Sequence, residues 1–157
     1  MIIITGASDG LGREIAKLIV ARGQIAISLS RTKPEDDEID WIKTDLTQEK
    51  SITSAVEQLL ARKEPIKAFI SCAAVVSYES ADNLTSAELE KMFGTNVTGP
   101  MFLTSKLLER LKRDEADIVN IGATIALKSG YEQQMVYSTT KWALRGFTQN
   151  LQSELKK

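Results

Sequence analysis

The sequence predicts an α/β protein in which helices cover both faces of one doubly wound parallel sheet. Two observations predict this fold: short apolar runs alternate with stretches of helical periodicity, and a glycine-rich loop joins the first run to the first helical stretch. Strands that alternate with helices form right-handed β-α-β units, so they lie parallel in a buried sheet. A chain of 157 residues has the length of one domain, so we expect residues 1–157 to be a single domain.

The first half of the chain contains three predicted strands and two predicted helices. The run at 2–4 is β-branched, and the helix after the glycine loop keeps apolar residues at helical spacing up to Gly23, a typical C-terminal glycine. Strands are predicted at 24–29 and 39–43, on either side of a loop that holds a proline and four acidic residues. The helix at 51–62 has its apolar residues on one face and ends before a proline.

The second half contains two predicted strands and three predicted helices. A fourth strand covers 66–70, a helix covers 86–93, and another helix begins at Pro100. The fifth strand covers 117–121, and one long helical pattern occupies 134–157. A two-half sheet of this type has six strands. We therefore expect a sheet truncated after the fifth strand and its following helix.

Composition argues against several classes of function. With 20 Lys+Arg against 21 Asp+Glu, the formal net charge is −1, which favours neither nucleic acid nor an anionic membrane as a partner. The apolar runs are too short to span a bilayer or to form a signal peptide, so we expect a cytoplasmic protein. The chain has no histidine and a single cysteine, Cys72, which excludes a histidine base and predicts no metal site.

The loop between the first strand and the first helix is a candidate phosphate site. Its glycines let the backbone turn sharply and approach a pyrophosphate, which the free N–H groups of the following helix would then attract. Alone, such a loop is as often a tight strand–helix connection, but the surrounding β-α units favour a dinucleotide site. The candidate residues are Thr5, Gly6, Ser8, Asp9, Gly10, Leu11 and Gly12.

The end of the second strand indicates which dinucleotide is bound. An acidic residue there would accept hydrogen bonds from a ribose 2′-hydroxyl, whereas Arg31 suits a 2′-phosphate. This favours NADP as the cofactor, with NAD as the alternative. Asp9 adds negative charge nearby and works against NADP, and Arg31 could also be an ordinary solvated cation.

Tyr137 and Lys141 are the candidate catalytic pair. They lie four residues apart in a helical stretch, so both side chains project from one face. A free tyrosine titrates near about 10. A nearby ammonium is expected to lower this pKa, which would make the phenol a useful proton donor and acceptor. Taken alone, the spacing is common by chance and is more typical of a surface pair; it gains force only beside the glycine loop.

Together these motifs make the chain resemble the short-chain dehydrogenases/reductases. The resemblance is carried by the loop 5–12, by Asp45 and Leu46, by Asn96, and by the motif 137–141. It implies a Rossmann-type fold and NAD(P)-dependent oxidation of alcohols or reduction of carbonyls, with a small molecule as substrate.

The resemblance also implies a role for each matching residue. Tyr137 would exchange the substrate proton, and Lys141 would hold the nicotinamide ribose and lower the pKa of the tyrosine. Asn96 would kink its helix and hold a water in a proton relay. Asp45, with Leu46 beside it, would bind the adenine. The family has Asn-Asn-Ala-Gly after the fourth strand, where this chain has Ser71, Cys72, Ala73 and Ala74. The last three would border the cofactor.

One family position has two candidates here. The family places a serine about thirteen residues before the tyrosine, where its hydroxyl polarises the substrate carbonyl. Counting back from Tyr137 gives Thr124, whereas aligning from 119–121 gives Ala123. A loop insertion around 129–130 would account for the difference. Thr124 keeps the hydroxyl and Ala123 lacks it.

The long helices predict a partner. Those that carry Phe102 and Trp142 have more apolar residues than one sheet face needs, although ordinary core packing is the alternative. The equivalent helices form oligomer interfaces in the family, so the resemblance implies a homodimer or homotetramer. A competing hypothesis for the function is a non-catalytic nucleotide-binding or interaction module of the same fold.

Overall fold

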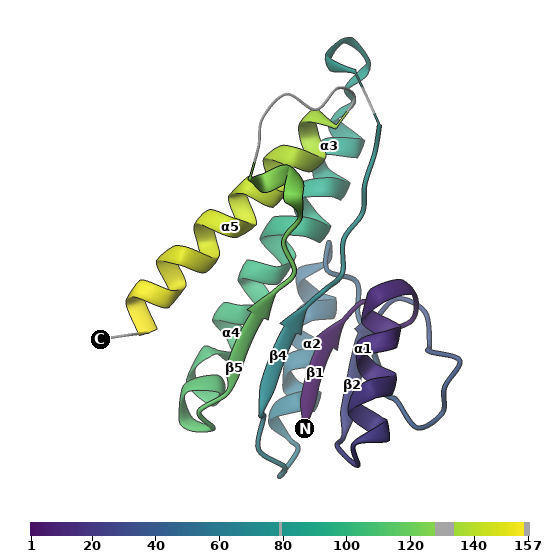
Figure 1. Cartoon of the computed structure of the whole chain (residues 1–157), viewed down its shortest axis with the longest axis vertical. Helices are drawn as coiled ribbons and strands as arrows, with labels where there is room; N and C mark the ends of the chain where they lie inside the picture. Colours follow the sequence, from purple (N-terminus) through teal and green to yellow (C-terminus); the bar gives the residue numbers. More distant parts are fainter. Residues whose placement is uncertain (79, 128–133, 156–157) are drawn as a thin grey trace.

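The computed structural model describes residues 1–78, 80–127 and 134–155. Its strands form one parallel sheet in the order β3-β2-β1-β4-β5 (Figure 1). All five strand predictions are confirmed, with bounds shifted by one or two residues. The strands are β1 (Ile2–Thr5), β2 (Ala26–Ser30), β3 (Asp40–Lys43), β4 (Ala68–Ser71) and β5 (Asp117–Asn120).

The helices also follow the prediction, with one difference. The two helices expected at 86–93 and from Pro100 are joined by a π-helical segment, η2 (Gly94–Thr98), so the chain runs from one into the other without a loop. The α-helices are α1 (Gly10–Ala21), α2 (Glu49–Leu60), α3 (Ser86–Phe93), α4 (Gly99–Arg113) and α5 (Met135–Leu155). Two short turns, η1 (Ala81–Asn83) and η3 (Thr124–Ala126), complete the description.

Helices cover both faces of the sheet, as predicted, because successive strand residues point to opposite sides. Ile3 belongs to the apolar cluster that includes residues of α2 and α4, whereas its neighbour Ile4 belongs to the cluster on the α1 side. Both side chains are fully buried. The sheet is therefore packed between two apolar layers, and its loops are left to carry the polar chemistry.

Strand β5 forms one edge of the sheet. It pairs with β4 so that Val119 lies beside Ile70. Ile70 packs against the cluster on the α1 side, but Val119 is 41% exposed. The apolar cover on that side therefore ends at β4.

Most of the apolar residues that the long helices carry belong to the hydrophobic core. On α4, Leu103, Leu107 and Leu111 are buried against the sheet, and Phe102 packs partly against the same cluster. Trp142 on α5 differs, because it is 44% exposed and the guanidinium of a neighbouring arginine lies over its ring.

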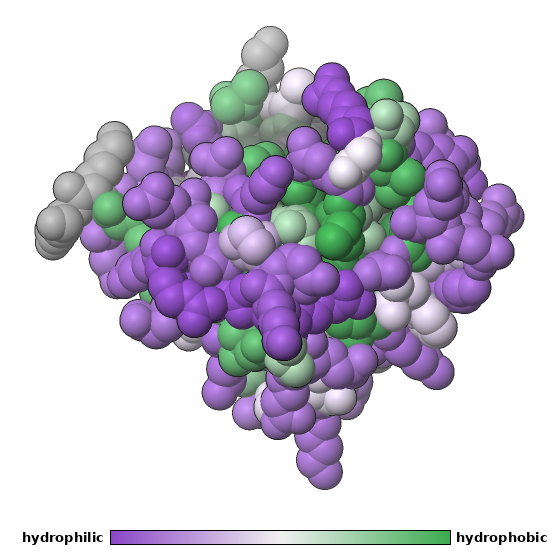
Figure 2. All heavy atoms as spheres, turned by 90° about the horizontal axis from the view of Figure 1, so that it is seen from below, coloured by the Kyte–Doolittle hydropathy of each residue, from purple (hydrophilic) through white to green (hydrophobic). Residues whose placement is uncertain are grey.

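A buried ion pair lies at the end of the molecule where the strands begin. Hydrophilic side chains cover most of this end (Figure 2). Beneath them, the guanidinium of Arg110 donates to the carboxylate of Asp114 and to the carbonyl oxygen of Glu64, and both charged side chains are buried. The carboxylate also accepts a hydrogen bond of 2.8 Å from the N–H of Ile66. The pair thus joins the end of α4 to the segment before β4.

The pKa of Asp114 follows from these contacts. Burial raises it, but the hydrogen bonds from Ile66 and Arg110 outweigh burial and hold the pKa at about 2. The folded value lies below the usual value, so the ionised carboxylate stabilises the fold above about pH 4. That stability is lost as the pH falls from about 4 towards 2.

Asp114→Asn should lower the free energy of unfolding at neutral pH by about 2 kcal/mol, because a buried guanidinium loses its counter-charge. It should also flatten the dependence of stability on pH below about 4. Urea denaturation at neutral and acidic pH measures both. Asp117→Asn removes a nearby exposed carboxylate and should change stability by less than about 0.5 kcal/mol. Equal effects of the two substitutions would contradict this account.

Candidate functional site

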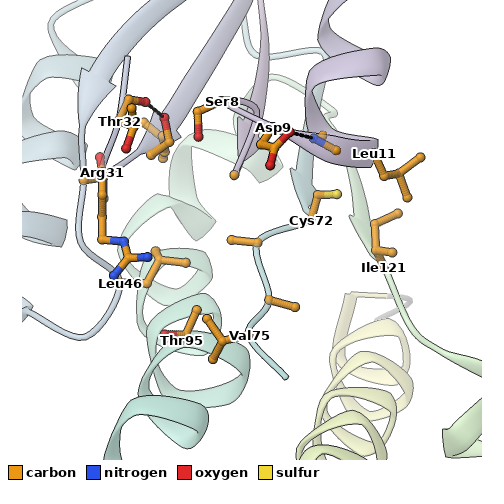
Figure 3. Close-up of a pocket in the computed structure, with 18 of the residues that line it drawn as sticks. Ser8, Asp9, Leu11, Arg31, Thr32, Leu46, Cys72, Val75, Thr95 and Ile121 are labelled. Carbon is orange, nitrogen blue, oxygen red and sulfur yellow. Dashed lines mark hydrogen bonds between the residues drawn. The ribbon is translucent and has the colours of Figure 1, made fainter. Parts of the chain in front are cut away.

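A cleft of about 530 Å³ opens where the central strands end (Figure 3). The chain leaves β1 on one side of the sheet and β4 on the other, so the loops after these neighbouring strands diverge and leave a crevice between them. The lining residues come from the loops after all five strands and from the start of α5. Residues far apart in the sequence thus meet at one edge of the sheet.

The glycine loop forms one wall of the cleft, and two of its glycines are required by space or conformation. Gly6 has a φ of +75°, and an added Cβ would lie 2.9 Å from the Cα of Ala73. An added Cβ on Gly12 would lie 2.5 Å from the carbonyl oxygen of Gly6. Helix α1 therefore packs directly on the loop, and its first N–H groups face the cleft.

Asp9 caps the start of α1. Its carboxylate accepts a hydrogen bond of 2.7 Å from the N–H of Gly10 and lies 3.9 Å from the guanidinium of Arg13. Asp9 lines the cleft together with Ser8, Gly10 and Leu11. The carboxylate of Asp9 thus contacts the first N–H of the helix and the guanidinium of Arg13.

Thr5 is the candidate residue of the glycine loop that lies beneath the cleft and does not line it. It is fully buried and is not among the cleft-lining residues. Its hydroxyl oxygen accepts hydrogen bonds of 3.0 Å from the N–H groups of Cys72 and Ala73. Thr5 therefore ties the end of β4 to β1 and positions the opposite wall of the cleft.

Cys72, Ala73 and Ala74 form that opposite wall, and Asn96 holds the segment that follows them. Cys72 points towards Leu11 and Ile121 (Figure 3). Asn96 lies in η2 and is 1% exposed. Its amide accepts from the N–H of Val75 and donates to the carbonyl oxygen of the same residue, both at 2.8 Å.

Asn96 also links this wall to α5. Its amide nitrogen donates to the hydroxyl of Thr140 at 3.1 Å. Thr140 directly precedes Lys141 in the chain. Asn96 lies in the π-helical segment η2, at the position where the resemblance implied a kinked helix. Thr140 was missed by the sequence reasoning, since a threonine inside a helix carries no signal of its own.

Tyr137 and Lys141 close the far end of the cleft, and both line it. The ammonium of Lys141 lies 5.8 Å from the centre of the Tyr137 ring. Lys141 is 3% exposed and donates a hydrogen bond of 2.9 Å to the carbonyl oxygen of Ile121. The predicted pair is therefore brought together, with the lysine fixed by the loop after β5.

The expected lowering of the tyrosine pKa by this lysine is wrong for the chain as it is folded. Burial raises the pKa of Tyr137, and the nearby Tyr78 raises it further. Burial also lowers the pKa of Lys141, which the Cys72 thiol partly offsets. The spacing predicted the proximity of the two groups but not the loss of solvent around them, which favours their neutral forms. The Cys72 thiol likewise has its pKa raised by burial.

Arg31, Asp45 and Leu46 lie at the other end of the cleft. Arg31 is exposed and extends towards Leu46 (Figure 3). The carboxylate of Asp45 accepts hydrogen bonds from the N–H and the hydroxyl of Thr47, at 2.9 and 2.7 Å. The hydroxyl of Ser30 donates to the carbonyl oxygen of Thr32 at 2.7 Å, which shapes the turn that carries Arg31.

The two candidates for a carbonyl-polarising hydroxyl lie outside the cleft lining. Thr124 is exposed in η3, and Ala123 borders a separate apolar pocket between β5 and α5. Among residues 121–127, Ile121 and Gly122 line the cleft, and neither carries a hydroxyl. The loop insertion expected at 129–130 lies outside the described residues.

Several cleft residues were not singled out from the sequence. They lie at or after the carboxyl ends of β2, β3, β4 and β5 or in η2, and a systematic search of all strand ends would have found most of them. They include Val75, Thr95, Ile121 and Gly122.

None of the described helices is long and apolar enough to cross a membrane.

Comparison with known proteins identifies the same family that the sequence motifs resemble. The family model of short chain dehydrogenases matches residues 1–157. The 3-oxoacyl-(acyl-carrier-protein) reductase of Aquifex aeolicus is 28% identical over 166 residues, which cover 98% of this chain and 66% of the relative. The first eight curated relatives are covered over 48% to 71% of their own lengths. For most of them the chain thus spans about half to two thirds of the relative.

Solved structures show the same fold. A short-chain dehydrogenase from Streptomyces avermitilis has a TM-score of 0.90 and 28% identity, with 99% of this chain and 60% of that chain covered. Two more distant structures hold a cofactor. The dehydrogenase from Leptospira borgpetersenii binds NAD+ (TM-score 0.88, 22% identity, 96% and 63% covered), and ElxO binds NADP (TM-score 0.88, 20% identity, 99% and 67% covered).

Proposed function

The chain belongs to the short-chain dehydrogenase family, and from that premise we propose that it binds NADP and interconverts a small alcohol with its carbonyl compound. One observation carries the proposal. The glycine loop, Arg31 and the pair Tyr137–Lys141 line a single cleft, although the pair lies more than a hundred residues after the other two in the chain.

The residues of the cleft fit an extended dinucleotide. At Gly6 and Gly12 an added Cβ would clash with neighbouring backbone, and the loop ends at a helix N-terminus, which suits a pyrophosphate. Arg31 and Leu46 at one end suit a phosphorylated ribose and an adenine. Lys141 at the other end has one N–H bonded to Ile121 and two more for ribose hydroxyls.

In this proposal the bound nicotinamide supplies the hydride for carbonyl reduction and accepts it for alcohol oxidation. Tyr137 gives a proton to the carbonyl oxygen as the alcohol forms. Burial and Tyr78 raise the pKa of Tyr137, so the phenol is protonated at neutral pH and can donate this proton. Lys141 orients the ribose, and Asn96 holds the loop at Val75 so that the walls of the cleft stay in place.

Arg31→Asp should shift cofactor preference from NADPH towards NADH. We expect the ratio of the two affinities to fall by about tenfold to thirtyfold, because the carboxylate repels a 2′-phosphate and accepts hydrogen bonds from a 2′-hydroxyl. Fluorescence titration of both reduced nucleotides measures the ratio. Arg22→Asp, an exposed arginine at the opposite end of α1, is the matched control. An unchanged ratio in Arg31→Asp would remove Arg31 from cofactor selection.

A second candidate function is a non-catalytic nucleotide-binding module of the same fold. It is favoured by the segment after β5, where the described cleft-lining residues are Ile121 and Gly122 rather than a hydroxyl donor. Loss of one such donor typically reduces the rate by about 10²–10³. Saturable NADPH binding without turnover of any small aldehyde or ketone in a test panel would favour this module over the enzyme.

We further propose that the chain assembles as a homodimer or homotetramer through its long helices. The exposed Trp142 on α5 and Met101 on α4 support this, since both leave apolar surface uncovered. Sedimentation of the purified chain as a monomer at micromolar concentration would reject it.

A further inference from the structure

A small polar pocket adjoins the cleft at its Arg31 end. It is lined by Arg31, Lys43, Asp45, Ser51 and Ser54, and it shares Arg31 and Asp45 with the cleft. Lys43 ends β3 and pairs in register with Ser30, the residue before Arg31. Two cations from adjacent strands therefore border one pocket. Lys43 and Ser51 are not among the cofactor-binding residues predicted from the sequence.

Three acidic residues of the loop after β2 and of β3 pair with cations other than Arg31 and Lys43. In the loop between β2 and β3, the carboxylate of Asp37 lies 2.7 Å from the ammonium of Lys33, and that of Glu35 lies 3.9 Å from the guanidinium of Arg13. Asp40, at the start of β3, pairs with Arg62 at 2.7 Å. Arg31 and Lys43 form no ion pair with any residue that the structure describes. Both cations thus remain free for a ligand.

The pocket holds two cations and hydroxyl groups against one carboxylate, that of Asp45, so it favours an anion that accepts several hydrogen bonds. The Asp45 carboxylate is held by Thr47, as described above. The hydroxyl oxygen of Ser51 accepts the N–H of Asp45 at 2.9 Å, which leaves its own O–H free to donate. A phosphate monoester carries up to two negative charges and three acceptor oxygens, and it matches two cations and a hydroxyl donor.

We infer that Lys43 is a second phosphate-binding cation, which together with Arg31 and Ser51 holds the 2′-phosphate of a bound NADP. The inference rests on the proposed function, because the phosphate reaches this pocket as part of a dinucleotide that lies in the cleft. It adds a specificity-determining residue at the end of β3, where no sequence motif marks Lys43.

Substitution of Lys43 tests this inference. Lys43→Met should weaken NADPH binding by about fivefold to tenfold and leave NADH binding unchanged, because NADH has no 2′-phosphate. The difference should shrink as salt is added, since both cations are exposed to solvent. Lys43→Arg should restore NADPH affinity to within about twofold. Calorimetric titration of both nucleotides gives these values.

Lys50→Met is the matched control. Lys50 is also exposed and lies at the start of α2, but outside this pocket. If Lys43→Met and Lys50→Met weaken NADPH binding equally, Lys43 has no place in phosphate recognition, and the proposed function stands without it. If the unsubstituted chain binds neither nucleotide, or binds both equally, the cofactor assignment fails together with this inference. A circular dichroism spectrum of each variant verifies that it is folded.

Discussion

Replacing Tyr137 by phenylalanine should reduce carbonyl reduction by about 10²–10⁴-fold, because the phenol is the proton donor in the proposed reaction. NADPH affinity should change by less than about threefold, since the aromatic ring stays in place and Lys141 keeps its hydrogen bond to Ile121. The readout is NADPH oxidation by absorbance with a panel of small aldehydes and ketones. Affinity is measured separately by fluorescence titration.

Tyr78→Phe is the matched control for this prediction. Tyr78 is 63% exposed and lies near Tyr137, where it raises the pKa of the catalytic candidate without lining the cleft. Its loss should leave turnover within about threefold of the original rate. Turnover retained in Tyr137→Phe, or lost equally in both variants, would remove Tyr137 from the mechanism.

Replacing Gly12 by alanine should disrupt the wall of the cleft that faces the pyrophosphate. The new Cβ would lie 2.5 Å from the carbonyl oxygen of Gly6, and the Gly6 backbone is itself packed against Ala73. Because backbone on both sides resists the shift, we expect the free energy of unfolding to fall by about 3 kcal/mol. NADPH affinity should fall by about 100-fold, since the loop must move away from its binding geometry.

Gly146→Ala provides the opposite case. Gly146 lies inside α5, and an added Cβ would meet nothing within 4 Å. Alanine should therefore stabilise the chain by about 0.5–1 kcal/mol and leave NADPH affinity unchanged. Urea denaturation and calorimetric titration of both variants give the comparison. A Gly12→Ala chain as stable as the original would show that the loop is not packed as described.

The fold could be predicted because its determinants are local. β-branched runs such as residues 2–4, a glycine or proline in several connections and helical spacing of apolar residues specify the elements. The alternation of strands and helices specifies the parallel sheet. The helical link between α3 and α4 was missed, because the sequence pattern of Gly94–Thr98 does not distinguish a π-helical turn from a break.

The site could be predicted in part. Residues in sequence motifs, such as Gly12 and Tyr137, lie in the cleft as expected, since the ends of parallel strands meet at one edge of the sheet. The spacing of residues in the sequence could not show which groups surround each side chain in the folded chain. The raised pKa of Tyr137 depends on burial by distant segments, and the clamp of Asn96 on Val75 depends on a contact across 21 positions. Lys43 enters the candidate site through strand pairing, which no motif encodes.

In the proposed function, a dinucleotide lies along the cleft between the glycine loop and Tyr137. Calorimetric titration of the purified chain with NADPH measures this binding. We expect saturable binding of one nucleotide per chain, weakened by about 100-fold in Gly12→Ala and weaker for NADH than for NADPH. Absence of saturable heat with either nucleotide, or equal NADPH binding by the original chain and Gly12→Ala, would show that no dinucleotide binds in this cleft as proposed.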